Sequence, residues 1–178
     1  MTLYLIRHGK TEANERRLYC GSTDLPLSEQ GRRELQALRY DIQNVRFVTS
    51  GMRRANETME LLFPEQPYDR EPDFREVDFG TFEMHSYREL KDDPAYQSWI
   101  TGDNEGNVPP GGESGTQMTR RVLAAFAKLQ EDTCLITHGG VIATIMAHLF
   151  PQYGRHRYQW QPENGHGYRI TENGFSEL

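Results

Sequence analysis

Short apolar runs alternate along the chain with segments whose apolar residues recur every three or four positions. The runs at residues 3–6, 47–49 and 133–137 predict short buried strands. The periodic segments at about 29–40, 53–63 and 113–130, and the apolar segment that ends at residue 150, predict helices. Ser28 suits the N-cap of the first of these helices, and Pro64 ends the second.

The remaining segments are shorter or less regular. Residues 64–82 contain three prolines and predict irregular chain, and residues 87–99 predict two short helices broken near Pro94. A loop rich in glycine, proline and asparagine follows at 102–112, and residues 158–160 and 168–170 predict late strands. Because repeats and interdomain linkers are not evident, we expect one domain over residues 1–178, with a small helical and loop cap at about 81–112.

The order of the predicted elements indicates the fold class. Strands that are each followed by a helix predict an α/β fold with a mainly parallel central sheet. In such sheets ligands bind beyond the carboxyl ends of the strands. Three predicted strands end in polar residues and glycine, at Arg7-His8-Gly9, at 50–54 and at His138-Gly139-Gly140. These three ends are therefore expected to converge on one pocket.

Composition and charge narrow the classes of function. The 178-residue chain has a formal net charge of −6, which argues against general binding to nucleic acid or to a membrane surface. An anionic substrate therefore needs a local positive pocket. The N-terminal apolar run is too short for a signal peptide or a membrane span. Cys20 and Cys134 fit neither a disulfide framework nor a zinc site, so we expect a soluble, cytoplasmic protein.

The residue types at the strand ends suit phosphoryl transfer. Arginines and helix N-termini stabilise the negative charge of the transferred group, and a neutral imidazole can act as nucleophile. A carboxylic acid can protonate the leaving oxygen. The sequence supplies these groups as His8, His138, Arg7, Arg54 and Glu76. Each has a structural alternative, since a lone histidine or arginine at such a position is more often structural or solvated, but their joint placement favours catalysis.

Five motifs carry a resemblance over nearly the whole chain. They are Arg7-His8-Gly9-Lys10-Thr11-Glu12-Ala13-Asn14, the segment 21–31 with Asp24-Leu25-Pro26-Leu27-Ser28, Ser50-Gly51-Met52-Arg53-Arg54-Ala55, Glu76-Val77-Asp78-Phe79-Gly80 and Thr137-His138-Gly139-Gly140-Val141. Together they resemble the histidine phosphatase superfamily, which includes the cofactor-dependent phosphoglycerate mutases. The resemblance selects Arg54 over Arg53, because the family arginine precedes alanine. Gly51 stands where the family usually has proline, a departure expected to alter only the turn.

The resemblance implies a three-layer sandwich, a catalytic route and a set of site residues. His8 takes the phosphoryl group, Arg7, Arg54 and His138 hold its oxygens, and Glu76 protonates the leaving oxygen and then activates water. The substrate-binding residues implied in addition are Asn14, Gly21, Ser22 and Gly139. No metal or other cofactor is expected, because the arginines and histidines replace the divalent ion that many phosphatases use.

The charges expected around the site support the role of His8 but not directly that of Glu76. Nearby arginines disfavour protonation of His8 and keep it nucleophilic. The same arginines favour the ionised form of Glu76, so its role as an acid needs desolvation or a dianionic substrate nearby.

A more local resemblance concerns the substrate. The segments 80–87, 96–99 and 109–114 are similar to those of α-ribazole phosphatases of cobalamin synthesis, and Met84 stands where the wider family usually has glycine. This resemblance implies hydrolysis of α-ribazole 5′-phosphate to α-ribazole. Its benzimidazole could stack on aromatic side chains of the cap, which otherwise are simply the core of the cap. The residues expected to contact the substrate in the cap are Glu83, His85 and Tyr87, with Phe82 and Trp99 as further stacking candidates.

Other functions stay open. A broad-specificity phosphatase or a phosphoglycerate mutase could use the same scaffold, and a non-catalytic module could bind phosphorylated ligands. The presence of His8, Glu76 and His138 disfavours the non-catalytic module. The expected partner is a small-molecule phosphate ester, without nucleic acid or membrane, for a monomer or homodimer.

Overall fold

A six-stranded sheet forms the centre of the computed structural model, which describes residues 1–178. The strand order is β3-β2-β4-β1-β5-β6. Neighbours from β3 to β1 are parallel, whereas β5 and β6 are antiparallel to their neighbours. The strands are β1 Leu3–Arg7, β2 Arg46–Thr49, β3 Asp69–Arg70, β4 Thr133–Thr137, β5 Gly167–Thr171 and β6 Gly174–Glu177. The predicted α/β fold with a mainly parallel sheet is confirmed.

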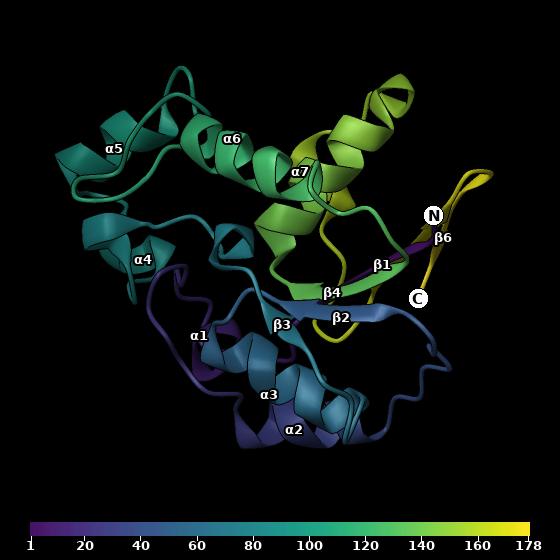
Figure 1. The fold of residues 1–178 in the computed structure, drawn as a ribbon. Helices are drawn as coiled ribbons and strands as arrows, with labels where there is room; N and C mark the ends of the chain where they lie inside the picture. The colour runs from purple at the N-terminus through teal and green to yellow at the C-terminus, as the bar shows by residue number, and fades with distance from the viewer.

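Helices cover both faces of the sheet and give the predicted three layers. In Figure 1, α2 and α3 lie on one side of the sheet and α6 and α7 on the other, while α4 and α5 lie beyond one end of the strands. The helices are α1 Glu12–Glu15, α2 Glu29–Gln36, α3 Arg53–Leu62, α4 Tyr87–Leu90, α5 Pro94–Ile100, α6 Gly115–Phe126 and α7 Gly139–Leu149. Short 3₁₀ helices are η1 Pro72–Phe74, η2 Gly80–Phe82, η3 Pro151–Tyr153 and η4 Arg157–Trp160.

Two hydrophobic cores lie on opposite faces of the sheet. Successive side chains of a strand point to opposite faces, so Leu5 packs in the core under α6 and α7 while Ile6 packs in the core under α3. Leu135 and Ile136 of β4 divide in the same way. Burying each such side chain contributes about 1.5–3 kcal/mol, which explains why the central residues of these strands are apolar. Cys134 is fully buried, and both cysteines are free.

Several predicted boundaries need correction. Residues 158–160 are not a strand but belong to η4, because Trp160 turns inward and is fully buried. The strand β6 was not predicted. The helix predicted at 29–40 ends at Gln36, and α6 is shorter than the predicted 113–130 because Ser114 caps it at its start and Ala127 at its end.

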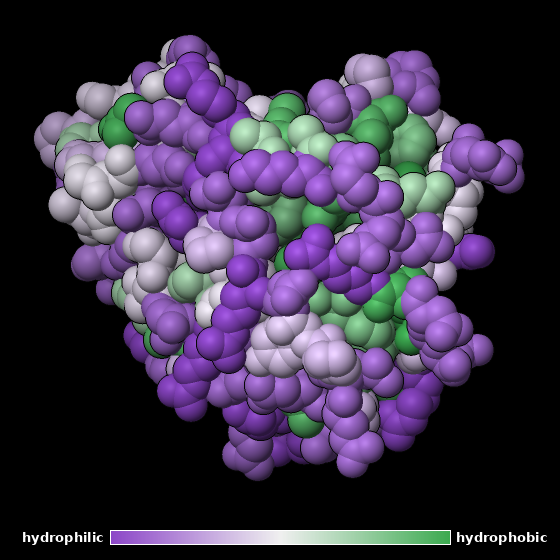
Figure 2. Space-filling view, in the orientation of Figure 1, coloured by the Kyte–Doolittle hydropathy of each residue, from purple (hydrophilic) through white to green (hydrophobic).

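The segment between η2 and α6 has its own small core. Phe82, Leu90 and Tyr96 are buried there together, with Tyr19 and Trp99 packed against them. This segment corresponds to the predicted cap. That the cap and the rest of the chain form a single domain stays a prediction. The face drawn in Figure 2 is mostly hydrophilic, with apolar residues in separate patches. No helix combines the length and apolar character that crossing a membrane requires.

Candidate active site

His8 lies directly after β1 and is almost fully buried. Its Nδ1 is 2.7 Å from the carbonyl oxygen of Gly9. Because a carbonyl can only accept, Nδ1 carries the hydrogen and Nε2 keeps its lone pair. Asn164 fixes the backbone at this point by donating its side-chain N–H to the His8 carbonyl at 2.9 Å. The imidazole is therefore held in the tautomer that leaves Nε2 free to attack.

A second histidine faces the first from the end of the neighbouring strand. His138 caps α7 directly after β4, and its ring centroid lies 5.1 Å from that of His8. Nε2 of His138 shares a hydrogen bond of 2.8 Å with the hydroxyl of Ser50, which follows β2. The three strand ends that the sequence singled out therefore converge, as expected for parallel strands that are neighbours in one sheet.

Two arginines bring positive charge to these histidines. Arg54, in the first turn of α3, is 1% exposed and donates to the carbonyls of Gly21 at 2.8 Å and Thr23 at 2.9 Å. Arg7 donates to the carbonyl of Pro162 at 2.8 Å. Neither guanidinium has a carboxylate within ion-pair distance, although nine such pairs form elsewhere. Two nearly buried cations without counterions make a site suited to an anion.

Only two buried side-chain polar atoms of the structure lack a hydrogen-bond partner, and both belong to this site. They are Nε of Arg7 and Nδ1 of His138. Leaving a buried polar group unpaired costs about 1–3 kcal/mol, so such atoms need an explanation. Oxygens of a bound oxyanion would satisfy them.

Glu76 reaches the site from the irregular segment after η1. One carboxylate oxygen accepts the N–H of Gly140 at 2.9 Å, in the first turn of α7, and the other accepts the N–H of Val77 at 3.0 Å. A Cβ on Gly140 would lie 2.3 Å from the carboxylate, so this approach requires glycine. Arg121 holds the segment by donating to the Glu76 carbonyl at 3.0 Å and pairing with Glu113 at 2.7 Å.

A pocket of about 310 Å³ opens beside these groups. Arg7, Asn14, Glu76 and Gly140 line one part of it. Asn14 also accepts the Thr11 N–H at 2.9 Å, so its side chain helps to cap α1 as well as facing the pocket. The predicted Gly139 lies in the first turn of α7, where a Cβ would come within 3.3 Å of the Arg7 guanidinium.

The other predicted substrate contacts are arranged differently. The N–H groups of Gly21 and Ser22 both donate to the carboxylate of Glu83, so these three residues bind one another. His85 is exposed and its Nδ1 lies 2.9 Å from the Glu83 carbonyl, while Tyr87 is 59% exposed at the start of α4. Neither ring lines the pocket, so the structure offers no support for the prediction that they contact substrate.

Among the stacking candidates, only one lines the pocket. Phe82 is 1% exposed and packs inside the cap, whereas Trp99 lies on the pocket wall. Sequence reasoning missed the aromatic residues that join it there. Tyr19 and Phe79 are within 5.7 and 5.9 Å of Trp99 by ring centroid, and Tyr158 lines the pocket from η4.

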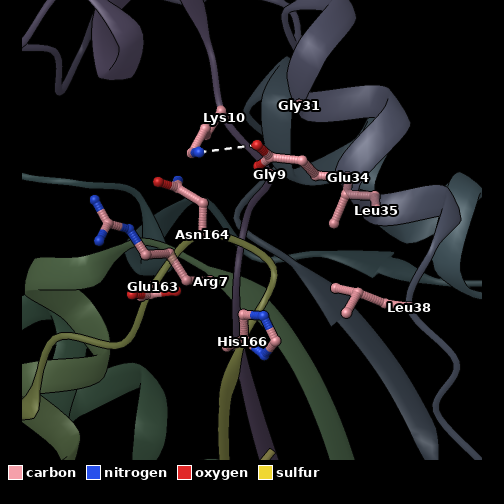
Figure 3. Close-up of a pocket in the computed structure, with 10 residues that line it drawn as sticks. All are labelled: Arg7, Gly9, Lys10, Gly31, Glu34, Leu35, Leu38, Glu163, Asn164 and His166. Atoms are coloured by element: carbon pink, nitrogen blue, oxygen red, sulfur yellow. Dashed lines mark hydrogen bonds and ion pairs between the residues drawn. The ribbon is translucent and has the colours of Figure 1, made fainter.

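A second pocket of about 510 Å³ lies beside the chain that follows β1 (Figure 3). Lys10 and Glu34 meet across it in an ion pair of 2.9 Å, and Leu35 and Leu38 line its apolar side (Figure 3). The Arg7 guanidinium points away from the leucines (Figure 3). The lysine of this pocket is already paired with Glu34, and its lining lacks Glu76, so it offers no proton donor of the kind that lines the smaller pocket.

Burial lowers the pKa of both histidines well below the usual value near 6.5, with a further contribution from the charges of Arg54 and Arg7. Below pH 6.5 these two imidazoles therefore bind protons in the unfolded chain but not in the folded protein. The stability that the two neutral histidines contribute is present above pH 6.5 and is lost as the pH falls below that value. Each histidine contributes a slope of up to about 1.4 kcal/mol per pH unit.

We expect the free energy of unfolding of His8→Asn to depend less on pH than that of the wild type. Removing one titrating histidine should reduce the loss between pH 6.5 and 5.5 by up to about 1 kcal/mol, because the unfolded imidazole is already half protonated at pH 6.5. Urea unfolding at the two pH values measures this difference. An equal pH dependence in both proteins would contradict the lowered pKa of His8.

Comparison with known proteins places the chain in a family. The model of the histidine phosphatase superfamily (branch 1) matches residues 3–174, a range that contains all the groups described above. The chain therefore belongs to the histidine phosphatase superfamily, and the family predicted from the sequence is confirmed.

Individual relatives agree with this placement. The adenosylcobalamin/alpha-ribazole phosphatase of Salmonella typhimurium (strain LT2) is 32% identical, and the match covers 93% of this chain and 87% of the relative. A crystal structure from Escherichia coli K-12, provisionally named an alpha-ribazole-5′-P phosphatase, has a TM-score of 0.86 at 26% identity and covers 100% of this chain and 94% of that one. The phosphoglycerate mutase structure from Thermus thermophilus has a TM-score of 0.80 at 29% identity, covering 100% and 96%.

Proposed function

We propose that this protein is a phosphomonoesterase that works through a phosphohistidine at His8. The observation that carries the proposal is the pair of unpartnered buried nitrogens on Arg7 and His138, which flank a histidine whose Nε2 is free. A phosphate group bound here would supply acceptors for both nitrogens and a phosphorus atom for Nε2. Orthovanadate, which mimics five-coordinate phosphorus, should therefore inhibit the enzyme.

The proposed reaction has two steps. Nε2 of His8 attacks phosphorus, the bond to the ester oxygen breaks, and that oxygen takes a proton from Glu76. Water then gives a proton to Glu76 and attacks the phosphohistidine, which releases phosphate and restores His8. Arg7 and Arg54 stabilise the charge on the phosphoryl oxygens in both steps.

The proposed substrate is α-ribazole 5′-phosphate, and the product is α-ribazole for cobalamin synthesis. Relatives named as α-ribazole phosphatases support this choice. The aromatic wall formed by Tyr19, Phe79, Trp99 and Tyr158 also supports it, because a flat benzimidazole can stack on such rings. The phosphate pocket binds the group common to all esters, so discrimination must come from this wall.

Tyr158→Ala should lower kcat/KM for α-ribazole 5′-phosphate by roughly 10-fold or more, the scale of one lost base–aromatic stack. The same variant should hydrolyse ribose 5-phosphate as the wild type does, because that ester has no base. Tyr158 is 70% exposed, so its removal should leave the fold intact. Steady-state kinetics on both esters, with EDTA present throughout to test the expected independence from metal, measures the effect.

Tyr87→Ala is the matched control, since Tyr87 is 59% exposed but lies outside the pocket. It should behave as wild type on both esters. Equal efficiency of the wild type on α-ribazole 5′-phosphate, ribose 5-phosphate and 3-phosphoglycerate would replace the proposal with a broad-specificity phosphatase. Efficient interconversion of phosphoglycerates would indicate a mutase, the activity in the name of the Thermus neighbour.

A further inference from the structure

Five hydrogen-bond donors converge on the carboxylate of Glu83. It accepts the N–H of Gly21 at 3.0 Å to each oxygen, the N–H of Ser22 at 2.7 Å and the N–H of Phe79 at 3.2 Å. The hydroxyls of Ser22 and Thr23 donate to it at 3.0 and 2.9 Å. With both oxygens engaged in this way, Glu83 has little capacity left to bind a substrate. Its function must lie in what it holds.

The segment that Glu83 holds is bound on its other side by Arg54. The guanidinium donates to the carbonyls of Gly21 and Thr23. A single peptide group links the two charges, because the peptide between Gly21 and Ser22 donates its N–H to Glu83 and accepts from Arg54 at its carbonyl. Its dipole is thus aligned between a carboxylate and a guanidinium, which strengthens both hydrogen bonds.

The packing leaves this segment little freedom. A Cβ on Gly21 would lie 1.6 Å from the Val77 carbonyl oxygen, so the segment 21–23 fits against the chain after Glu76 only with glycine at this position. Arg54 has no carboxylate within ion-pair distance. The two carbonyls are therefore the contacts that set the direction of its guanidinium.

We propose that Glu83 is a positioning residue for Arg54. Acting through residues 21–23, it directs the remaining guanidinium N–H groups towards the phosphate at His8. The proposal rests on the proposed phosphate site. It also connects the cap to that site, because Glu83 lies between η2 and α4, where the cap begins.

The test is a double-mutant cycle read out by binding. Glu83→Gln nearly keeps the shape but places an amide among five donors. Calorimetry with orthovanadate should show about 10-fold weaker binding for Glu83→Gln, the cost of a misplaced phosphate contact. In an Arg54→Ala background the same change should cost less than about 2-fold, because residues that act together are not additive. Arg54→Lys provides a second background if Arg54→Ala does not fold.

Two further variants separate positioning from general stability. Glu83→Asp keeps the charge and should recover part of the affinity. Glu89→Gln removes an exposed cap carboxylate that accepts the Ser86 N–H and hydroxyl, and it should bind orthovanadate as the wild type does. The thermal midpoint of each variant is measured alongside.

The outcomes are distinct from those of the phosphatase proposal. The positioning role would be overturned if Glu83→Gln weakened orthovanadate binding by the same factor in the wild-type and the Arg54→Ala backgrounds. It would also be overturned if Glu83→Gln bound orthovanadate within about 2-fold of the wild type. Failure of the wild type to bind orthovanadate would overturn it too. A wild type that binds orthovanadate but hydrolyses no ester would refute the phosphatase proposal, while the cycle would still decide the role of Glu83.

Discussion

His8→Ala is expected to lose at least about 10⁴-fold in kcat, because the variant has no nucleophile to form the covalent intermediate. In the wild type, rapid quench with ³²P-labelled substrate should trap phosphate on the protein. The bond should be labile in acid and stable in alkali, as a phosphoramidate is. Since Nδ1 is engaged with the Gly9 carbonyl at 2.7 Å, the phosphate should be on Nε2, which ³¹P NMR of the phosphopeptide can distinguish.

His85→Ala is the matched control, because it removes an exposed imidazole from the cap. It should retain both the label and the turnover. A label on serine, a label on Nδ1 of His8, or substantial turnover by His8→Ala would each contradict the mechanism. The lowered pKa of His8 also means that its neutral form persists below pH 6.5, so the nucleophile should not limit kcat/KM at that pH.

Much of the fold was predictable because its signals are local. The apolar run 133–137 and the glycines after His138 define β4 and the start of α7, and the structure places both at the predicted residues. The run 158–160 was also predicted to be a strand but forms a 3₁₀ helix. Three residues cannot distinguish a strand from a turn that buries Trp160, since that choice depends on contacts distant in sequence.

The candidate site, like the fold, was predictable from the sequence only in part. The placement of His8 and His138 follows from strand order, because polar residues after parallel neighbours meet at one edge. The direction of Arg54 depends instead on carbonyls more than thirty residues away in the chain, and no periodic pattern reports such a contact. Tyr158 was missed for a related reason, since only the tertiary fold brings η4 beside the cap.

Glu76→Gln is expected to lower kcat/KM on the order of 10²-fold or more for esters of alcohols, the scale of a lost general acid. The glutamine can still accept the Gly140 N–H through its carbonyl oxygen, but it gives up the hydrogen bond from the Val77 N–H. The loss in kcat/KM should shrink for p-nitrophenyl phosphate, because nitrophenolate leaves without a proton. Comparing alkyl and aryl phosphates under identical conditions measures this dependence.

The second step makes the prediction sharper, because water must give its proton to Glu76 whichever alcohol has left. With p-nitrophenyl phosphate, Glu76→Gln should therefore form phosphohistidine readily and hydrolyse it slowly. Stopped-flow absorbance should show a burst of nitrophenolate close to one equivalent per active site, followed by a slow steady state. Glu89→Gln is the control, since it removes an exposed carboxylate that lies outside the pocket. Equal losses in kcat/KM for alkyl and aryl esters, without a burst, would remove Glu76 from both proton-transfer roles.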